Sequence, residues 1–138
     1  MIYLAYGSNL HIPQMQRRCP TAKVLGTATL TGYRLVFNGV ATIVPDPDRS
    51  VPVLLWEIQP ADEKALDAYE GYPHLYRKET VQVDLDGRNI DAMVYLMNDD
   101  GVRPPGSFYY EVIYEGYRLN GLDPAPLEQA RTESLTAE

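Results

Sequence analysis

The sequence predicts an α+β fold in which strands outnumber helices. Several short apolar runs rich in Val, Ile, Thr and Tyr are bounded by Gly, Pro, Asn or Asp, which is the pattern of β-strands. Two stretches carry apolar residues at helical spacing, one at 61–70 and one that begins near Ser107. With 138 residues the chain has the size of one domain, and we expect residues 1–138 to form it.

The first strand is predicted at residues 2–6, and it runs directly into Gly7-Ser8-Asn9, which is a turn signal. Gly7 has no Cβ, so the backbone can turn sharply there and approach a ligand closely. Ser8 and Asn9 can cap a following helix, and exposed N–H groups at such a turn can bind an anion or an oxyanion. The alternative is an ordinary strand, turn and helix cap without a ligand.

The first half of the chain is predicted to continue with a short helix and a series of strands. The helix spans 11–18, where Pro13 is tolerated because it falls in the first turn. Alternating or wholly apolar runs predict strands at 23–30, 33–37, 40–44 and 51–58. Residues 45–50 are rich in proline and aspartate, so we expect a surface loop there.

The second half is predicted to alternate helices with a hairpin. Pro60 opens the helix at 61–70 and Gly71 ends it. Strands at 76–85 and 89–97 are joined by a tight turn with an Asp-Gly signal.

The C-terminal part of the chain is predicted to be helical. The helix that begins near Ser107 has its apolar residues at Tyr109, Val112, Ile113 and Tyr117. A short helix is expected at 124–131, and residues 132–138 are expected to be a frayed tail.

Composition and charge exclude several classes of protein. The net charge of −7 argues against a nucleic-acid partner, because such proteins show a clustered basic face and Arg17-Arg18 is too small to provide one. No apolar run approaches the roughly 20 residues of a membrane span. The sequence starts on its first predicted strand without signal-peptide features, and Cys19 is a single cysteine. We therefore expect a cytoplasmic protein.

Glu70 is the candidate general base. It follows Leu66 by four residues and so lies on the same, inward face of its helix. The helix dipole disfavours negative charge in the last turn, and partial burial would raise the carboxyl pKa in the same direction. A pKa raised from about 4.3 toward neutrality suits a general base at pH 7. The alternative is a solvated glutamate at a helix end.

Other chemistry has weaker support in the sequence. Ser8 lacks the pattern of a nucleophile elbow, and only His11 and His74 could serve it as a histidine base. Cys19 follows two arginines that could lower its pKa, but a cysteine before proline at the end of an element usually packs. The histidines and the cysteine show no metal-ligand spacing, so we infer no metal.

The opening octet Tyr3-Leu4-Ala5-Tyr6-Gly7-Ser8-Asn9-Leu10 closely resembles the signature of the γ-glutamylcyclotransferase (AIG2-like) family. Further similar segments follow in the family's order: Ala41-Thr42-Ile43, the strand with Trp56, Leu66-Asp67 through Glu70-Gly71, Tyr95-Leu96-Met97, Pro104-Pro105 through Tyr109, Gly116, and Asn120-Gly121-Leu122. The resemblance covers most of the chain. It implies a small mixed β-barrel with flanking helices and a pocket at the first loop.

The resemblance also implies an activity. The family's enzymes catalyse an intramolecular aminolysis, in which the α-amine of a γ-glutamyl group attacks its own γ-carbonyl, releasing 5-oxoproline and an amine without any cofactor. Glu70 matches the family's general acid/base, the backbone of residues 3–8 matches its substrate-binding loop, and Tyr109 matches a substrate-contacting tyrosine. From its helical spacing alone, Tyr109 would be assigned to core packing.

Three questions stay open at this level. The segment Tyr72-Pro73-His74-Leu75 resembles both γ-glutamylamine-directed and peptide-directed members, so the leaving amine is undefined. The sequence does not define the oligomeric state either. A binding module that keeps the pocket without turnover is an alternative of a different class. An acyl transferase that uses Cys19 is a third.

Overall fold

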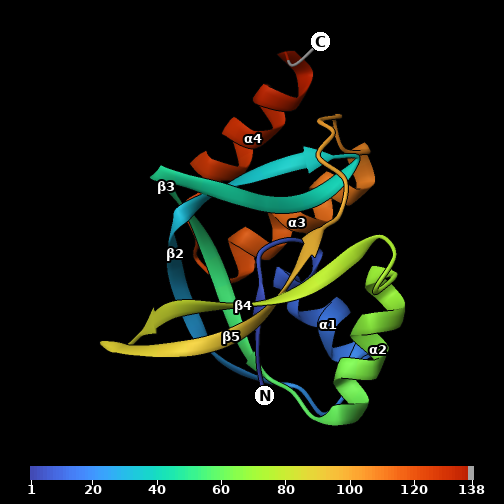
Figure 1. The fold of residues 1–138 in the computed structure, drawn as a ribbon, viewed down its shortest axis with the longest axis vertical. Helices are drawn as coiled ribbons and strands as arrows, with labels where there is room; N and C mark the ends of the chain where they lie inside the picture. The colour runs from blue at the N-terminus through green and yellow to red at the C-terminus, as the bar shows by residue number, and fades with distance from the viewer. Residues whose placement is uncertain (137–138) are drawn as a thin grey trace.

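The computed structural model describes residues 1–136 and is built around one five-stranded sheet (Figure 1). The elements are β1 (Ile2–Ala5), η1 (Ser8–Leu10, a 3₁₀ helix), α1 (Ile12–Arg18), β2 (Lys23–Asn38), β3 (Val40–Glu57), α2 (Pro60–Glu70), β4 (Tyr76–Leu85), β5 (Arg88–Met97), α3 (Ser107–Leu119) and α4 (Ala125–Thr136). The strand order is β2-β3-β1-β5-β4, with β1 parallel to β5 and the other neighbours antiparallel. The predicted α+β class with a mixed sheet is confirmed.

The sheet is not closed into a barrel, which corrects the closed form that the family resemblance implied. The sheet order begins at β2 and ends at β4, and these two strands are not paired in the described part of the chain. They nevertheless come close, because a Cβ added at Gly26 would lie 3.4 Å from Cδ1 of Leu85. Side chains rather than backbone hydrogen bonds thus cover the gap between the two edge strands.

The β2 and β3 strands are longer than the sequence indicated, and the predicted surface loop at 45–50 is wrong. Those residues lie within β3, where Pro45 is opposite Tyr33 and Ser50 is opposite Thr31. Between these pairs four residues of β3, 46–49, stand against the single residue Gly32 of β2, so the register shifts by more than the one extra residue of an ordinary β-bulge. The ladder is interrupted over these residues, which accommodates Pro47 inside the strand.

Two local predictions are confirmed in detail. The β4–β5 hairpin turns at Asp86 and Gly87, whose φ angles of 52° and 84° are both positive, as its tight two-residue turn requires. Helix α2 ends at Glu70, and Gly71 adopts the left-handed conformation with φ 67°. The direction of the chain at the end of α2 is therefore set by its own sequence.

Three helix details differ from the predictions. Helix α1 is capped by His11, whose Nδ1 accepts a hydrogen bond from Gln14 N at 3.3 Å, because Ser8 and Asn9 are used in η1 instead. The cap of α3 is Gly106, and its buried tyrosines are Tyr110 and Tyr117, whereas Tyr109 is half-buried.

The predicted frayed tail is also wrong over residues 132–136. Helix α4 continues through Thr136 and buries Ser134, because it packs against β2 and β3. An ion pair of 3.0 Å joins Arg49 of β3 to Glu133 of α4. Residues 137–138 of the predicted tail lie outside the described residues.

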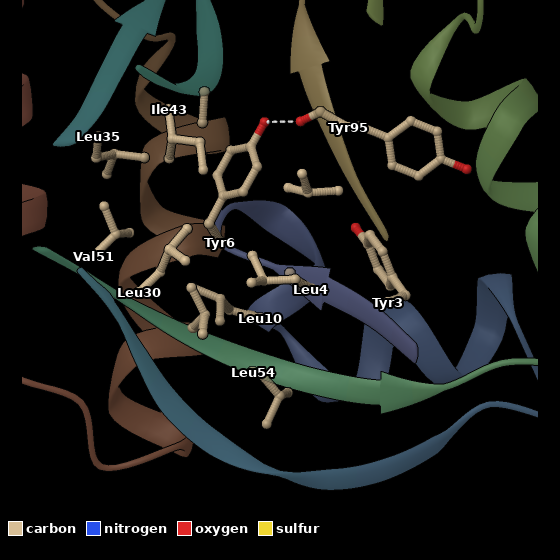
Figure 2. Close-up of a cluster of buried hydrophobic side chains, with 14 of the residues drawn as sticks. Tyr3, Leu4, Tyr6, Leu10, Leu30, Leu35, Ile43, Val51, Leu54 and Tyr95 are labelled. Atoms are coloured by element: carbon tan, nitrogen blue, oxygen red, sulfur yellow. Dashed lines mark hydrogen bonds between the residues drawn. The ribbon is translucent and has the colours of Figure 1, made fainter. Parts of the chain in front are cut away.

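The core surrounds the first strand (Figure 2). Side chains from β1, η1 and the β2–β3 hairpin pack there, among them Leu4, Leu10, Leu30, Leu35, Ile43, Val51 and Leu54. The Tyr6 hydroxyl reaches across this cluster and donates to the backbone oxygen of Tyr95 at 2.6 Å. No helix in residues 1–136 combines the length and apolarity needed to cross a membrane.

Helix α3 packs directly on η1 at Gly116. A Cβ at this position would lie 2.8 Å from Cβ of Leu10 and 2.9 Å from N of His11. One turn later, the Asn120 side chain donates to the backbone oxygen of Leu10 at 2.8 Å. Close approach at Gly116 and this hydrogen bond hold η1 in place behind the first loop.

We expect Gly116→Ala to destabilise the protein by about 1–3 kcal/mol, because the added methyl group overpacks the contact with Leu10. Chemical denaturation monitored by circular dichroism measures this change. Gly106→Ala is the matched control, since nothing lies within 4 Å of a Cβ at Gly106. Equal stability of the two variants would contradict the close contact.

Candidate active site

A cavity of about 250 Å³ opens beside the first loop, where segments from both halves of the chain converge. Its lining consists of Tyr3, Tyr6, Gly7, Ser8, Asn9, Val40, Ala41, Tyr69, Glu70, Leu75, Tyr76, Tyr95 and Tyr109. Six of these thirteen residues are tyrosines, so the walls combine apolar rings with hydroxyl groups. The cavity therefore suits a small ligand that is partly polar.

The turn at Gly7 and Ser8 forms one wall of this cavity. Leu10 N donates to Gly7 O at 2.9 Å and His11 N donates to Ser8 O at 3.0 Å, which closes the turn of η1. The preceding amides, at Gly7, Ser8 and Asn9, come before the first hydrogen-bonded amide of η1 and have no partner within it. Successive N–H groups in such a turn create a site for negative charge.

Gly7 also lets the turn approach β3. A Cβ at Gly7 would lie 3.4 Å from Cβ of Ala41, so the turn and β3 lie within van der Waals reach of each other. The Ala41 backbone is itself held by two tyrosines, because its N–H donates to the Tyr109 hydroxyl at 3.0 Å and its carbonyl accepts from the Tyr76 hydroxyl at 2.6 Å. The start of β3 is thus fixed opposite the turn.

Glu70 lies across the cavity as the last residue of α2. Burial raises the pKa of its carboxyl from the ordinary 4.5 to about 7, and the positive charge of Arg18 opposes part of this rise. The sequence analysis predicted a raised pKa from the helix end and from partial burial, and in the structure burial is the main cause. A carboxyl with this pKa can both accept and return a proton near neutral pH.

The structure does not assemble a serine triad. The Ser8 hydroxyl is hydrogen-bonded to the Tyr69 hydroxyl at 2.9 Å. Neither histidine lines the cavity, and His11 is used as the cap of α1. Ser8 therefore has no histidine base beside it among residues 1–136.

Cys19 is placed away from the cavity. Its thiol is buried and donates to the backbone oxygen of Asp62 at 3.6 Å. Burial raises the pKa of the thiol to about 11, and the nearby charge of Arg18 lowers it only in part. Chemistry based on a Cys19 thiolate has no support in this geometry.

The remaining residues predicted for the site divide into two groups. Tyr3, Tyr6 and Tyr109 line the cavity. Leu4 and Ala5 do not, because they are buried in β1 opposite Leu55 and Leu54 of β3. The side chains of Leu4 and Ala5 therefore support the loop by packing in the hydrophobic core.

The sequence analysis did not assign seven of the lining residues to the site, namely Asn9, Val40, Ala41, Tyr69, Leu75, Tyr76 and Tyr95. They come from η1, β3, α2, β4 and β5 and from the loop after α2. The available signal was compositional: eleven tyrosines against two phenylalanines in the chain. Composition cannot say which rings meet, because their meeting depends on strand order.

The comparisons with known proteins agree on one family. The family model described as gamma-glutamyl cyclotransferase, AIG2-like, matches residues 3–116. The chain is 31% identical over 141 residues to gamma-glutamylcyclotransferase of Homo sapiens, covering 92% of this chain and 73% of the human protein. The corresponding protein of Bos taurus also shows 31% identity over the same shares. A solved structure named gamma-glutamyl cyclotransferase superimposes with a TM-score of 0.82 at 28% identity, covering 99% of this chain and 86% of the other.

The raised pKa of Glu70 links stability to pH. The unfolded carboxyl releases its proton near the ordinary pKa of 4.5, whereas the folded one keeps it up to about pH 7. Between these values the folded state binds more protons, so the free energy of unfolding falls as pH rises. This loss of stability is absent below pH 4.5 and complete above about pH 7, and it amounts to about 3 kcal/mol.

We expect Glu70→Gln to remove this pH dependence, since glutamine carries no proton to lose. Its stability relative to the wild type should rise by about 3 kcal/mol between pH 4.5 and pH 8. Urea denaturation across this range measures the difference. Glu115→Gln, at an exposed position paired with Arg118, serves as the control. Parallel profiles for the wild type and Glu70→Gln would show that the carboxyl titrates normally.

Proposed function

The chain belongs to the gamma-glutamyl cyclotransferase, AIG2-like family, and we propose that it is a γ-glutamylcyclotransferase, a lyase that converts a γ-glutamyl amine or amino acid into 5-oxoproline and the free amine. One observation carries the mechanism. Glu70, with its pKa raised to about 7, faces the same cavity as the turn at Gly7 and Ser8. A proton acceptor and a set of backbone donors are thereby available to one small ligand.

The proposed reaction balances without any other reactant. The α-amine of the substrate forms a new C–N bond to the γ-carbonyl carbon, and the C–N bond to the attached amine breaks. The attacking ammonium group loses two of its three protons and keeps the third as the ring N–H, and the departing nitrogen gains two protons and leaves as an ammonium. In our proposal Glu70 accepts a proton from the attacking nitrogen and returns one to the leaving nitrogen, which a carboxyl with a pKa near neutrality does efficiently.

The turn stabilises the intermediate in this proposal. The N–H groups of Gly7 and Ser8 would hold the oxyanion that develops on the γ-carbonyl, a contribution of about 3–4 kcal/mol for each well-placed donor. Nucleophile and electrophile belong to one molecule, so the cavity has only to fold the glutamyl chain. Good orientation of this kind contributes about 7–11 kcal/mol.

The tyrosines differ in what they can offer a substrate. The hydroxyls of Tyr3 and Tyr109 accept hydrogen bonds, from the side-chain amide of Asn9 at 2.9 Å and from Ala41 N at 3.0 Å, respectively. Each therefore keeps its own O–H proton for a ligand. The Tyr6 hydroxyl already donates to Tyr95 O, so Tyr6 contributes its ring. We infer that Tyr3 and Tyr109 are the tyrosines that donate to the substrate.

The remaining predicted features fit this function. Leu4 and Ala5 act through β1 by fixing the loop, and the substrate is a small molecule held by the cavity. We place the reaction in the cytoplasm, as the composition predicted, which agrees with a free, buried Cys19.

We expect the wild type to release 5-oxoproline from at least one member of a panel of γ-glutamyl amines, amino acids and peptides. Glu70→Gln should lower kcat by about 10²–10⁴-fold while substrate affinity is retained, because it loses the proton acceptor but not the turn. In the wild type kcat/KM should rise with pH and level off above about pH 7, where Glu70 is ionised.

Chromatographic assay of 5-oxoproline and calorimetric titration of the substrate provide the two readouts, with Glu115→Gln as the control. Turnover that survives Glu70→Gln unchanged would refute the role of Glu70. Equal binding by both proteins with no product from any substrate would instead favour a binding module that lacks turnover.

Ser8→Ala should retain activity within about tenfold of the wild type, because Ser8 is proposed to act through its backbone N–H. Tyr69→Phe removes the other partner of the same hydrogen bond and should have an effect of similar size. Steady-state kinetics on both variants measure this. Complete loss in Ser8→Ala, with Tyr69→Phe near normal, would make the Ser8 hydroxyl a nucleophile.

A further inference from the structure

Arg18, the last residue of α1, contacts the active site from outside the cavity. Its Cζ lies 3.5 Å from the centroid of the Tyr69 ring, and its Nη1 donates to the side-chain oxygen of Asn9. Both of these partners line the cavity, whereas Arg18 does not. Arg18 forms no ion pair with any carboxylate in residues 1–136. It is therefore a cation held by neutral groups.

The two partners of Arg18 belong to different elements that line the cavity. Tyr69 precedes Glu70 on α2, and its hydroxyl is bonded to the Ser8 hydroxyl at 2.9 Å. Asn9 donates to the Tyr3 hydroxyl at 2.9 Å. One guanidinium group thus connects the last turn of α2 with the turn of η1, which are far apart in the sequence.

Arg18 also acts electrostatically on Glu70, because its positive charge lowers the pKa of the Glu70 carboxyl. The other titratable groups facing Glu70 are tyrosines from β1, the first loop, β4, β5 and α3, namely Tyr3, Tyr6, Tyr76, Tyr95 and Tyr109. Burial raises the pKa of each of them, so all five stay neutral near pH 7. The positive charge of Arg18, which stacks on the neighbouring Tyr69, therefore favours the ionised form of Glu70 against the larger effect of burial.

We propose that Arg18 is a positioning residue with two separable actions: its planar group holds Tyr69 and Asn9 around the turn, and its charge supports the ionised form of Glu70. The first action rests on the proposed function, because it concerns substrate binding. The second is a property of the folded protein and needs no turnover. Lysine can replace the charge, but it has no planar guanidinium group to stack on Tyr69 while bonding Asn9.

Stability measurements test the charge. The free energy of unfolding is measured against pH for the protein with Glu70 and for its Glu70→Gln variant, and the midpoint is the pH at which half of the difference between them has developed. This midpoint is determined in four backgrounds: wild type, Arg18→Met, Arg18→Lys and Arg17→Met. We expect the midpoint to move up by about 1 pH unit in Arg18→Met and to stay near the wild type in Arg18→Lys. Arg17 is the matched control, because it carries the same charge on the same helix but is exposed. An unchanged midpoint in Arg18→Met overturns this action.

Kinetic measurements test the planar contacts. Arg18→Lys and Arg18→Met should both raise KM by about tenfold, since each loses the stacking and the bond to Asn9. Only Arg18→Met should also shift the rise of kcat/KM to higher pH. An unchanged KM in both variants, matching Arg17→Met, overturns this action.

The design separates failure of the proposal from failure of the proposed function. If the wild type releases no 5-oxoproline, the proposed function fails, and the stability midpoint still decides whether Arg18 acts on Glu70. If Arg18→Met does not fold, Arg18→Gln takes its place, because it also removes the charge while keeping a planar polar group. A midpoint that moves in Arg18→Gln supports the proposal, and one that stays overturns it.

Discussion

The burial of one carboxyl at the end of α2 is the interaction on which the site depends. Glu70 is the last residue of α2, which Gly71 ends in a left-handed conformation, and its carboxyl lies at the ring-lined cavity. The surrounding rings shield the carboxyl from water, and within residues 1–136 the charged group that acts on it is Arg18. The fold accepts this destabilising placement, as is common where a group must exchange protons near neutral pH.

The use of tyrosine rather than phenylalanine follows from this burial. A cavity lined only with apolar rings would desolvate Glu70 but could not orient a polar ligand. Tyrosines exclude water with their rings and place hydroxyls at defined points. Tyr6 and Tyr76 donate to backbone oxygens of β5 and β3, and Tyr95 donates to Asp67 of α2 at 2.6 Å. These bonds join the walls to one another, so the shape of the cavity is tied to the packing of the sheet.

The accuracy of the sequence-based predictions depended on how local each determinant was. The hairpin at Asp86 and Gly87 and the end of α2 were predicted because turn geometry is decided by a few adjacent residues. The predictions of a loop at 45–50 and a frayed tail at 132–136 were wrong. Residues 45–50 belong to β3, which pairs with β2, and residues 132–136 belong to α4, which packs against both strands. In the site, Gly7, Ser8 and Glu70 carried local signals, whereas the tyrosines of β4 and β5 did not.

By itself, the sequence determined most of the elements, the turn after the first strand, the carboxyl at the end of α2, and through its signature the family. Only the tertiary structure decided that these two features face one cavity, that the sheet stays open, and that Arg18 links the cavity walls. The physical reason is range: turns and helix ends depend on neighbouring residues, while burial, pKa and the partners of Tyr69 and Asn9 depend on segments that meet only after folding.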